Sequence, residues 1–226
     1  MRDQLKRAAA TAAIELVEEG MLVGLGTGST ADHVLELLGE RVAGGLTMTG
    51  VSTSERTATR ARELGIPLRV FESGLSIDLA IDGADEVSPQ LDLIKGLGGA
   101  LLREKQVESC AEQLVIIVDD SKLVERLGRG PLPVEVATDD ADATLAQLRA
   151  LGCEVELRRD ADTPFVTDNG NCIVHISFTA GIDDPAALDA RLLALPGVID
   201  TGLFLGMADV VFCSGPEGVQ RLERTV

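Results

Sequence analysis

Met21-Leu22-Val23-Gly24-Leu25-Gly26-Thr27-Gly28-Ser29-Thr30-Ala31 carries the clearest structural signal in this chain. Its apolar start predicts a buried strand, and residues 30–42 repeat apolar side chains at helical spacing. A glycine-rich turn between a strand and a helix presents backbone N–H groups to an anion, and Ser29 and Thr30 add hydroxyls. The segment therefore predicts a parallel strand followed by a phosphate-binding turn.

The turn does not match two known nucleotide-binding motifs. Residues 26–31 have the G-x-G-x-x-A spacing of a dinucleotide site, but Val51, which ends the next predicted strand, leads into Ser52-Thr53-Ser54 without an acid. A Walker A motif fails because no lysine precedes the hydroxyl residue. The turn favours a small phosphorylated metabolite, and a purely structural glycine turn stays open on this segment alone.

Strand and helix patterns alternate over the first 125 residues or so. This alternation predicts a parallel sheet covered on both faces by helices. The predicted strands are 21–25, 46–51, 77–81 and 114–118, and the predicted helices are 3–18, 30–42, 54–64 and about 99–113.

From residue 131 the pattern changes. Strands at 134–137, 153–157, 172–178 and 198–205, with helices at 142–151 and 185–195, follow the β-α-β-β-α-β order of a ferredoxin-like unit. A last apolar run, 209–213, is expected to return to the first sheet. We expect an α/β fold in which a Rossmann-like parallel-sheet domain (1–130 and 206–226) carries a smaller ferredoxin-like α+β domain (131–205), inserted near the C-terminus.

The charge balance is strongly acidic. The 37 Asp and Glu outnumber the 20 Lys and Arg, which gives a net charge of −17. Such a surface repels phosphate backbones, so nucleic-acid binding is disfavoured. Lysine occurs only at positions 6, 95, 105 and 122. Abundant acid with scarce lysine is typical of a protein from a high-salt cytoplasm, and it makes each remaining lysine a candidate for a function.

Nothing in the sequence points to export or to a membrane. The first six residues, MRDQLK, form a mostly polar segment, and no apolar stretch approaches the roughly 20 residues that a spanning helix needs. The cysteines are scattered without a C-x-x-C pair, at positions 110, 153, 172 and 213. We expect a cytoplasmic protein with free thiols, no structural zinc and no disulfides.

An acidic segment, Asp82-Gly83-Ala84-Asp85-Glu86, follows the strand predicted at 77–81. Open α/β sheets bind their ligands just past the carboxyl ends of such strands. Asp82 and Asp85 fit acid–base groups acting on sugar hydroxyls, or metal ligands, although His33 and His175 lie in other predicted elements. A solvated acidic loop stays open on this segment alone.

The most informative stretch is Lys95-Gly96-Leu97-Gly98-Gly99-Ala100-Leu101-Leu102-Arg103-Glu104-Lys105. A lysine and a glycine loop lead into a helix that presents Glu104 in an early turn. A carboxylate base beside a cation suits removal of a proton next to a carbonyl, because the cation stabilises the charge that develops on oxygen. A plain charged helix surface is the alternative. Lys122 follows another predicted strand and falls on the same sheet edge.

Together, in order and spacing, these segments resemble the A-type ribose-5-phosphate isomerase family over nearly the whole chain. The resemblance rests on GLGTGSTA, DGADEV, KGLGGALLREK and VDDSK. It implies interconversion of ribose 5-phosphate and ribulose 5-phosphate, a step of the non-oxidative pentose phosphate pathway.

The resemblance also implies a role for each matching residue. Glu104 is implied to be the base that moves a proton between C1 and C2, and Lys95 to stabilise the enediolate. Asp82 and Asp85 are implied to assist ring opening and proton movement on the hydroxyls. The implied substrate-binding residues are Thr27, Gly28, Ser29, Thr30, Gly83, Ala84, Gly96, Leu97, Gly98, Lys122 and Lys6.

One position departs from the family pattern: Leu97 stands where another glycine is usual, which puts backbone contacts there in question. The implied reaction needs no cofactor and no metal, since a base, a cation and a phosphate anchor suffice. By resemblance we expect a homodimer or homotetramer. The competing hypotheses are a sugar-phosphate sensor domain, an acyl-CoA transferase with a glutamate nucleophile and, less well supported, a nicotinamide dehydrogenase.

Overall fold

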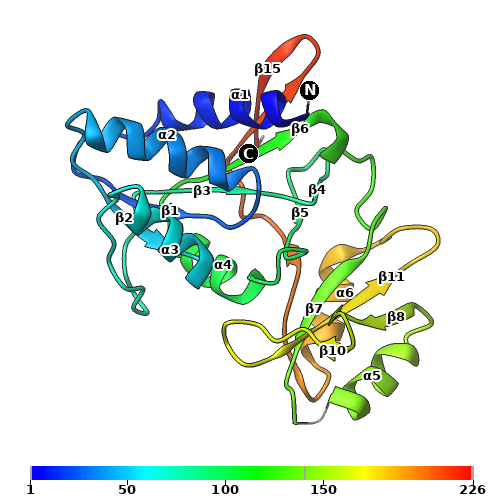
Figure 1. The fold of residues 1–226 in the computed structure, drawn as a ribbon. Helices are drawn as coiled ribbons and strands as arrows, with labels where there is room; N and C mark the ends of the chain where they lie inside the picture. Colours follow the sequence, from blue (N-terminus) through cyan, green and yellow to red (C-terminus); the bar gives the residue numbers. More distant parts are fainter. Residues whose placement is uncertain (1, 140, 225–226) are drawn as a thin grey trace.

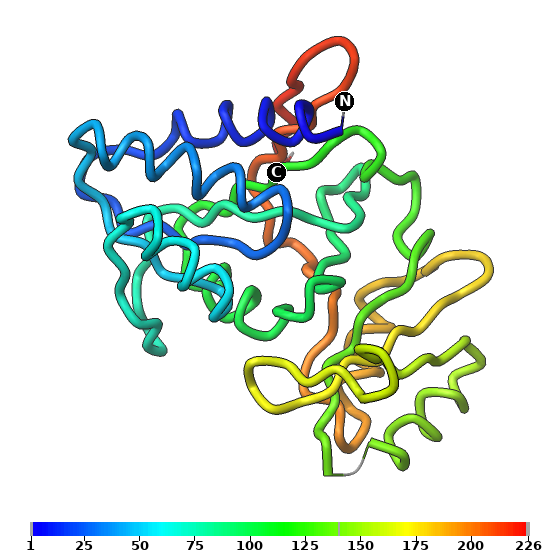
Figure 2. The backbone as a smooth tube through the Cα atoms, in the orientation of Figure 1, coloured from blue at the N-terminus to red at the C-terminus, as the bar shows by residue number. Residues whose placement is uncertain are grey.

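The structure, a computed structural model, describes residues 2–139 and 141–224. These residues fold around two main β-sheets (Figure 1). In the backbone trace the blue N-terminal helices lie on the larger sheet (Figure 2). The yellow-green and yellow segments gather on the other side of the molecule, around the smaller sheet, and the orange segment runs from there back to the larger sheet. The chain passes from the larger sheet to the smaller one once and returns once, before and after the segment that forms the smaller sheet.

The larger sheet has six strands in the order β15-β14-β6-β3-β1-β2. All neighbouring pairs are parallel except β14 with β15, which form an antiparallel hairpin. The strands are β1 (Leu22–Leu25), β2 (Thr49–Ser52), β3 (Leu79–Gly83), β6 (Leu114–Asp119), β14 (Val210–Gly215) and β15 (Gly218–Glu223). The predicted return of the chain to this sheet at 209–213 is confirmed, whereas β15 was not predicted.

Both faces of the parallel part of this sheet are buried, as a parallel sheet requires, whereas β15 at its edge is largely exposed. Along β6, Val115 and Ile117 pack into the cluster that includes α1 (Arg2–Ile14) and α2 (Ala31–Ala43). Ile116 points to the opposite face and joins a cluster that contains Phe204. The alternation therefore places α1 and α2 on one face of the sheet, and the helix that begins at Leu101 on the other.

Two further α-helices belong to this half of the molecule. Ser54 caps α3 (Glu55–Glu63) by accepting a hydrogen bond from the Thr57 amide, as its residue type predicts. The next helix, α4 (Leu101–Glu108), is shorter than the predicted 99–113. It begins after a glycine loop and leads into the loop before β6, and a short turn η1 (Asp120–Lys122) follows β6.

The smaller sheet is antiparallel, with four strands in the order β12-β7-β11-β8. Its elements follow the predicted β-α-β-β-α-β order, with a hairpin of β9 (Arg159–Asp160) and β10 (Thr163–Pro164) before the third strand. The elements are β7 (Leu132–Val136), α5 (Ala141–Arg149), β8 (Glu154–Leu157), β11 (Cys172–Ser177), α6 (Pro185–Leu193) and β12 (Val198–Thr201).

The prediction of one strand over 198–205 is wrong. The chain breaks at Gly202, so that β12 pairs with β7 while β13 (Leu203–Phe204) pairs with β5 (Leu93–Ile94). A side chain at Gly202 would lie 2.3 Å from the Lys95 carbonyl oxygen, so glycine lets the two backbones meet. With β4 (Glu86–Val87), β5 and β13 form a third, three-stranded sheet.

The predicted domain bounds, 1–130 with 206–226 and 131–205, stay a prediction, and residues 1, 140, 225 and 226 within them lie outside the described residues. None of the helices in the described part of the chain has the length and apolar character needed to cross a bilayer.

Candidate active site

A cavity of about 240 Å³ lies past the carboxyl ends of β1, β3 and β6. Thirteen of the fifteen predicted site residues line it: Lys6, Thr27, Gly28, Ser29, Thr30, Gly83, Ala84, Asp85, Lys95, Gly96, Gly98, Glu104 and Lys122. The other two, Asp82 and Leu97, are not among the lining residues, while Ala31 lines the cavity without having been predicted. Segments far apart in the sequence therefore converge on one sheet edge.

Asp82 ties the glycine turn to the end of β3. Its Oδ1 accepts hydrogen bonds from the amides of Thr27 (3.0 Å) and Gly83 (2.6 Å). A side chain at Gly26 would lie 2.0 Å from the same oxygen, so only glycine allows this approach. The carboxylate is 1% exposed, which makes it a buried anchor of the site.

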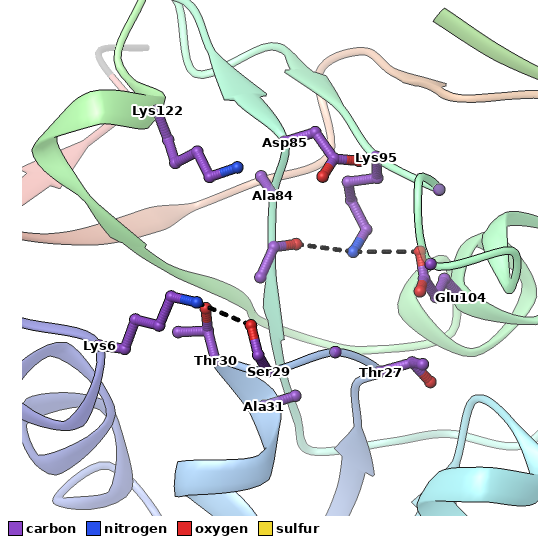
Figure 3. Close-up of a pocket in the computed structure, with 14 residues that line it drawn as sticks. Lys6, Thr27, Ser29, Thr30, Ala31, Ala84, Asp85, Lys95, Glu104 and Lys122 are labelled. Atoms are coloured by element: carbon purple, nitrogen blue, oxygen red, sulfur yellow. Dashed lines mark hydrogen bonds and ion pairs between the residues drawn. The ribbon is translucent and has the colours of Figure 1, made fainter. Parts of the chain in front are cut away.

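The Lys95 ammonium lies at the centre of a buried charge cluster. Its Nζ is 2.7 Å from Asp82 Oδ2, 3.3 Å from Glu104 Oε2 and 3.3 Å from Glu108 Oε1. It also donates to the Gly83 carbonyl oxygen at 2.8 Å. Figure 3 shows the Lys95 amine between the end of β3 and Glu104 on α4. The lysine thus connects the acidic segment to the helix that bears the predicted base.

The environment shifts the proton affinities of the groups in and around this cluster. Burial raises the pKa of Glu104 to about 8, against the opposing effect of Lys95. Burial also raises the pKa of Asp85, which the Leu97 amide and Lys95 partly offset. The carboxylates around Lys95 hold its pKa well above the ordinary value despite its burial. A base whose pKa lies near neutral pH is well matched to proton transfer.

The other end of the cavity is rich in cations and hydroxyls. Lys6 reaches from α1 and donates to Ser29 Oγ at 2.7 Å, and Lys122 enters from η1 (Figure 3). Thr30 is the N-cap residue of α2, so the backbone there belongs to the start of a helix. Three of the four lysines therefore line the cavity. The fourth, Lys105, instead bonds Asp200.

The Thr27 side chain takes part in a cluster of hydroxyls behind the turn. Its Oγ1 lies 2.8 Å from Thr53 Oγ1, 2.8 Å from Ser54 Oγ and 3.0 Å from Thr57 Oγ1. Thr57 in turn donates to the Gly26 carbonyl oxygen. These bonds hold the glycine turn to the start of α3, so Thr53, Ser54 and Thr57 support the turn structurally.

The glycine loop before α4 contacts residues of the half that contains the smaller sheet. At Gly99, which has φ +88°, a side chain would lie 2.5 Å from the Phe165 ring, and Arg158 stacks on that ring. Leu97 donates its amide to Asp85 Oδ2 (3.0 Å) and accepts from Arg158 Nη1 (2.9 Å). Leu97 is not in the left-handed region, so its backbone contacts form despite the departure from the family pattern.

Glu108 is the member of the cluster that the sequence interpretation missed. It lies four residues after Glu104, and residues at that spacing share a helix face, so the signal was present. Asp82, Glu104 and Glu108 offer oxygens within 4.8 Å of one another, a spacing that would suit a metal ion. Lys95 contacts all three of these residues, so the chain supplies the cluster's cation from its own side chain.

The chain is similar to known proteins over most of its length. The family model described as ribose 5-phosphate isomerase A (phosphoriboisomerase A) matches residues 49–218. The chain is 52% identical to the ribose-5-phosphate isomerase A of Roseiflexus castenholzii, over 99% of this chain and 97% of that protein.

Two solved structures have the same fold. The ribose 5-phosphate isomerase of Plasmodium falciparum superposes with a TM-score of 0.96 at 38% identity, covering 99% of this chain and 100% of that one. A D-ribose-5-phosphate isomerase in complex with phospho-erythronic acid gives 0.95 at 40% identity, with the same coverage. At this identity over the whole length, the chain belongs to the ribose 5-phosphate isomerase A family.

Proposed function

We propose that this chain interconverts D-ribose 5-phosphate and D-ribulose 5-phosphate through an enediolate, with Glu104 as the general base. The observation that carries the proposal is the 3.3 Å contact between Glu104 and Lys95 at one end of a cavity whose other end holds Lys6 and Lys122. A base beside a cation suits abstraction of a proton next to a carbonyl, and the lysines suit a phosphate.

The proton transfers of the reaction balance with these groups. The Glu104 carboxylate takes the proton from C2 of the open-chain aldose, the electrons of the C–H bond form the C1–C2 double bond, and O1 takes the negative charge. The hydroxyl proton of O2 then moves to O1, the C2 carbonyl forms, and Glu104 returns its proton to C1. Glu104 leaves the cycle in the state in which it entered.

The two aspartates have different surroundings, which supports different roles. Asp85 lines the cavity, so it is the group we assign to ring opening and to proton movement between the hydroxyls. Both oxygens of Asp82 accept hydrogen bonds within the protein: Oδ1 from two backbone amides and Oδ2 from the Lys95 ammonium. We therefore assign Asp82 to holding Lys95, whose charge faces the oxyanion at O1.

The phosphate supplies binding energy far from the reacting carbons. Lys6, Lys122, the Ser29 and Thr30 hydroxyls and the start of α2 form the cationic end of the cavity. Because the chain as a whole carries −17, this local group of lysines is what makes a dianionic substrate acceptable. Anchoring at this end orients C1 and C2 toward Glu104.

The test compares the wild type with Glu104→Gln, using Glu112→Gln as a matched control on an exposed glutamate that follows the same helix. We expect Glu104→Gln to lower kcat by about a thousandfold, because general-base catalysis is typically worth 10²–10⁴. It should also abolish uptake of solvent deuterium at C1 of the product. Near-normal turnover in Glu104→Gln would overturn the assignment.

We further propose that the enzyme acts in the cytoplasm, in the non-oxidative pentose phosphate pathway, as a homodimer or homotetramer. The four cysteines are free thiols, as in a reducing compartment. Leu193 on α6 and Ile199 on β12 are exposed apolar side chains on two contacting elements, which supports association of copies there. Sedimentation velocity at several concentrations tests this, and a monomer throughout would contradict it.

A further inference from the structure

Glu108 is a buried acid that the proposed reaction does not use. It lies one helical turn after Glu104 on α4, is 3% exposed and does not line the cavity. Apart from the ion pair with Lys95, neither of its oxygens has a hydrogen-bond partner among the described residues. A buried carboxylate without donors is costly, so its presence calls for a physical account.

The charges around Glu108 do not balance if every group is ionised. Lys95 brings one positive charge from the glycine loop, while Asp82 on β3 and Glu104 and Glu108 on α4 bring three negative charges. Buried like charges this close cannot all persist. Asp82 is the best compensated, with the 2.7 Å ion pair and two amide donors. The protons that reduce the surplus negative charge of the cluster are therefore bound by the two glutamates.

The position of each glutamate decides which one keeps its proton. Glu104 borders the cavity, whereas Glu108 lies behind Lys95 and away from it. Burial raises the pKa of Glu108 well above its ordinary range, against the pull of Lys95, and the negative charge of Asp82 adds to this effect. A neutral carboxylic acid also needs fewer donors than a carboxylate, which matches the surroundings of Glu108.

We propose that Glu108 is a positioning residue that keeps a proton inside the cluster throughout turnover, and so leaves the charge of Lys95 to Glu104 and to the substrate oxyanion. The inference rests on Glu104 being the base, as proposed above. Glu108 never contacts the substrate: it acts through Lys95, by withholding a second negative charge 3.3 Å from the ammonium.

This role predicts an effect on the alkaline side of the pH profile. When Glu108 loses its proton, its carboxylate competes for Lys95 and weakens stabilisation of the oxyanion, so the wild type loses activity at high pH. Glu108→Gln is a permanently neutral mimic of the protonated acid. It should keep the activity at neutral pH and lose the alkaline decline, which a merely structural role would not cause.

The experiment measures kcat and KM from about pH 6 to pH 10 for the wild type, Glu108→Gln and the control Glu112→Gln. We expect Glu108→Gln to stay within about threefold of the wild-type kcat at pH 7 and to shift the alkaline limb upward by about one pH unit or more. A profile that superposes on the wild type would overturn the inference. So would a roughly hundredfold loss of kcat at pH 7 with KM unchanged, since that would mean the carboxylate form is needed.

Infrared difference spectroscopy supplies a readout independent of activity. The wild type at pH 7 should show the carbonyl stretch of a protonated carboxylic acid that Glu108→Gln lacks, and its absence would overturn the inference. The two proposals fail separately. Turnover in Glu104→Gln refutes the base, whereas an inactive Glu104→Gln with an unshifted Glu108→Gln profile refutes only the role of Glu108.

Discussion

Replacing Glu104 by Gln should stabilise the folded protein at alkaline pH while removing its activity. Burial raises the pKa of Glu104 from 4.5 to about 8 on folding. A carboxyl group that holds its proton more tightly when folded contributes full stability only below its unfolded pKa. That contribution is lost as the pH rises through the folded value. As the pH rises from about 4.5 to 8, the folded wild type therefore progressively loses stability at this position. Gln does not titrate, so the variant does not lose it.

The size of the effect follows from the shift. A change from 4.5 to about 8 is worth at most about 5 kcal/mol, at about 1.4 kcal/mol per unit. Because Glu104 shares its protons with Glu108, we expect about half of that to appear. The free energy of unfolding of Glu104→Gln should exceed that of the wild type by about 2 kcal/mol more at pH 8.5 than at pH 5.5.

Urea denaturation followed by circular dichroism measures this difference at several pH values and constant salt. Intrinsic Trp or Tyr fluorescence is not an option, because the chain has neither residue. A lower limit of pH 5.5 keeps the protein away from its isoelectric point near 4.4. Glu112→Gln, an exposed charge removal, is the control. A difference from the wild type that stays constant from pH 5.5 to 8.5 would refute the reasoning.

Three further predictions concern the phosphate end, the turn and the surface. Lys6→Ala should raise the KM for ribose 5-phosphate about tenfold with little change in kcat, since it removes remote binding energy; steady-state kinetics showing a loss in kcat alone would contradict this. Gly26→Ala would put a methyl group 2.0 Å from Asp82 Oδ1, so the melting temperature should fall, by about 10 °C for a loss of about 3 kcal/mol; an unchanged melting curve would show that the turn can relax. Raising KCl from about 0.05 to 2 M should increase the free energy of unfolding, because salt screens the repulsion among acids in a chain of charge −17; stability independent of salt would argue against a high-salt adaptation.

Much of the fold is readable from local patterns. The strand and helix around the glycine turn stand out because the apolar run, the glycines and the helical periodicity all agree there. The short strands β4, β5 and β13 have no such signal, since two-residue strands are created by tertiary pairing. The break at Gly202 belongs to the same class: glycine is needed there because the Lys95 carbonyl approaches from a distant segment.

Some features of the site are likewise predictable from the sequence, and others are not. Its lining was predictable because parallel strands bring their carboxyl ends to one edge, so motifs after three strands had to meet. The depth of Asp82 was not predictable, because it depends on the space left by Gly26, which only the three-dimensional structure reveals. Glu108 was within reach, since its spacing from Glu104 puts both on one face of α4.

The distribution of lysines makes lysine-directed chemistry selective for the cavity. Lys95 is buried and Lys105 is bonded to Asp200, so Lys6 and Lys122 are the two lysine amines left for a reagent in solution, and both line the cavity. A surface rich in arginine and acid offers an acylating or reductive-alkylating reagent few other lysine targets. Coupling this protein to a support or a dye through its lysines would therefore block substrate entry. The same reagents, with ribose 5-phosphate as a protectant, would report occupancy of the phosphate end.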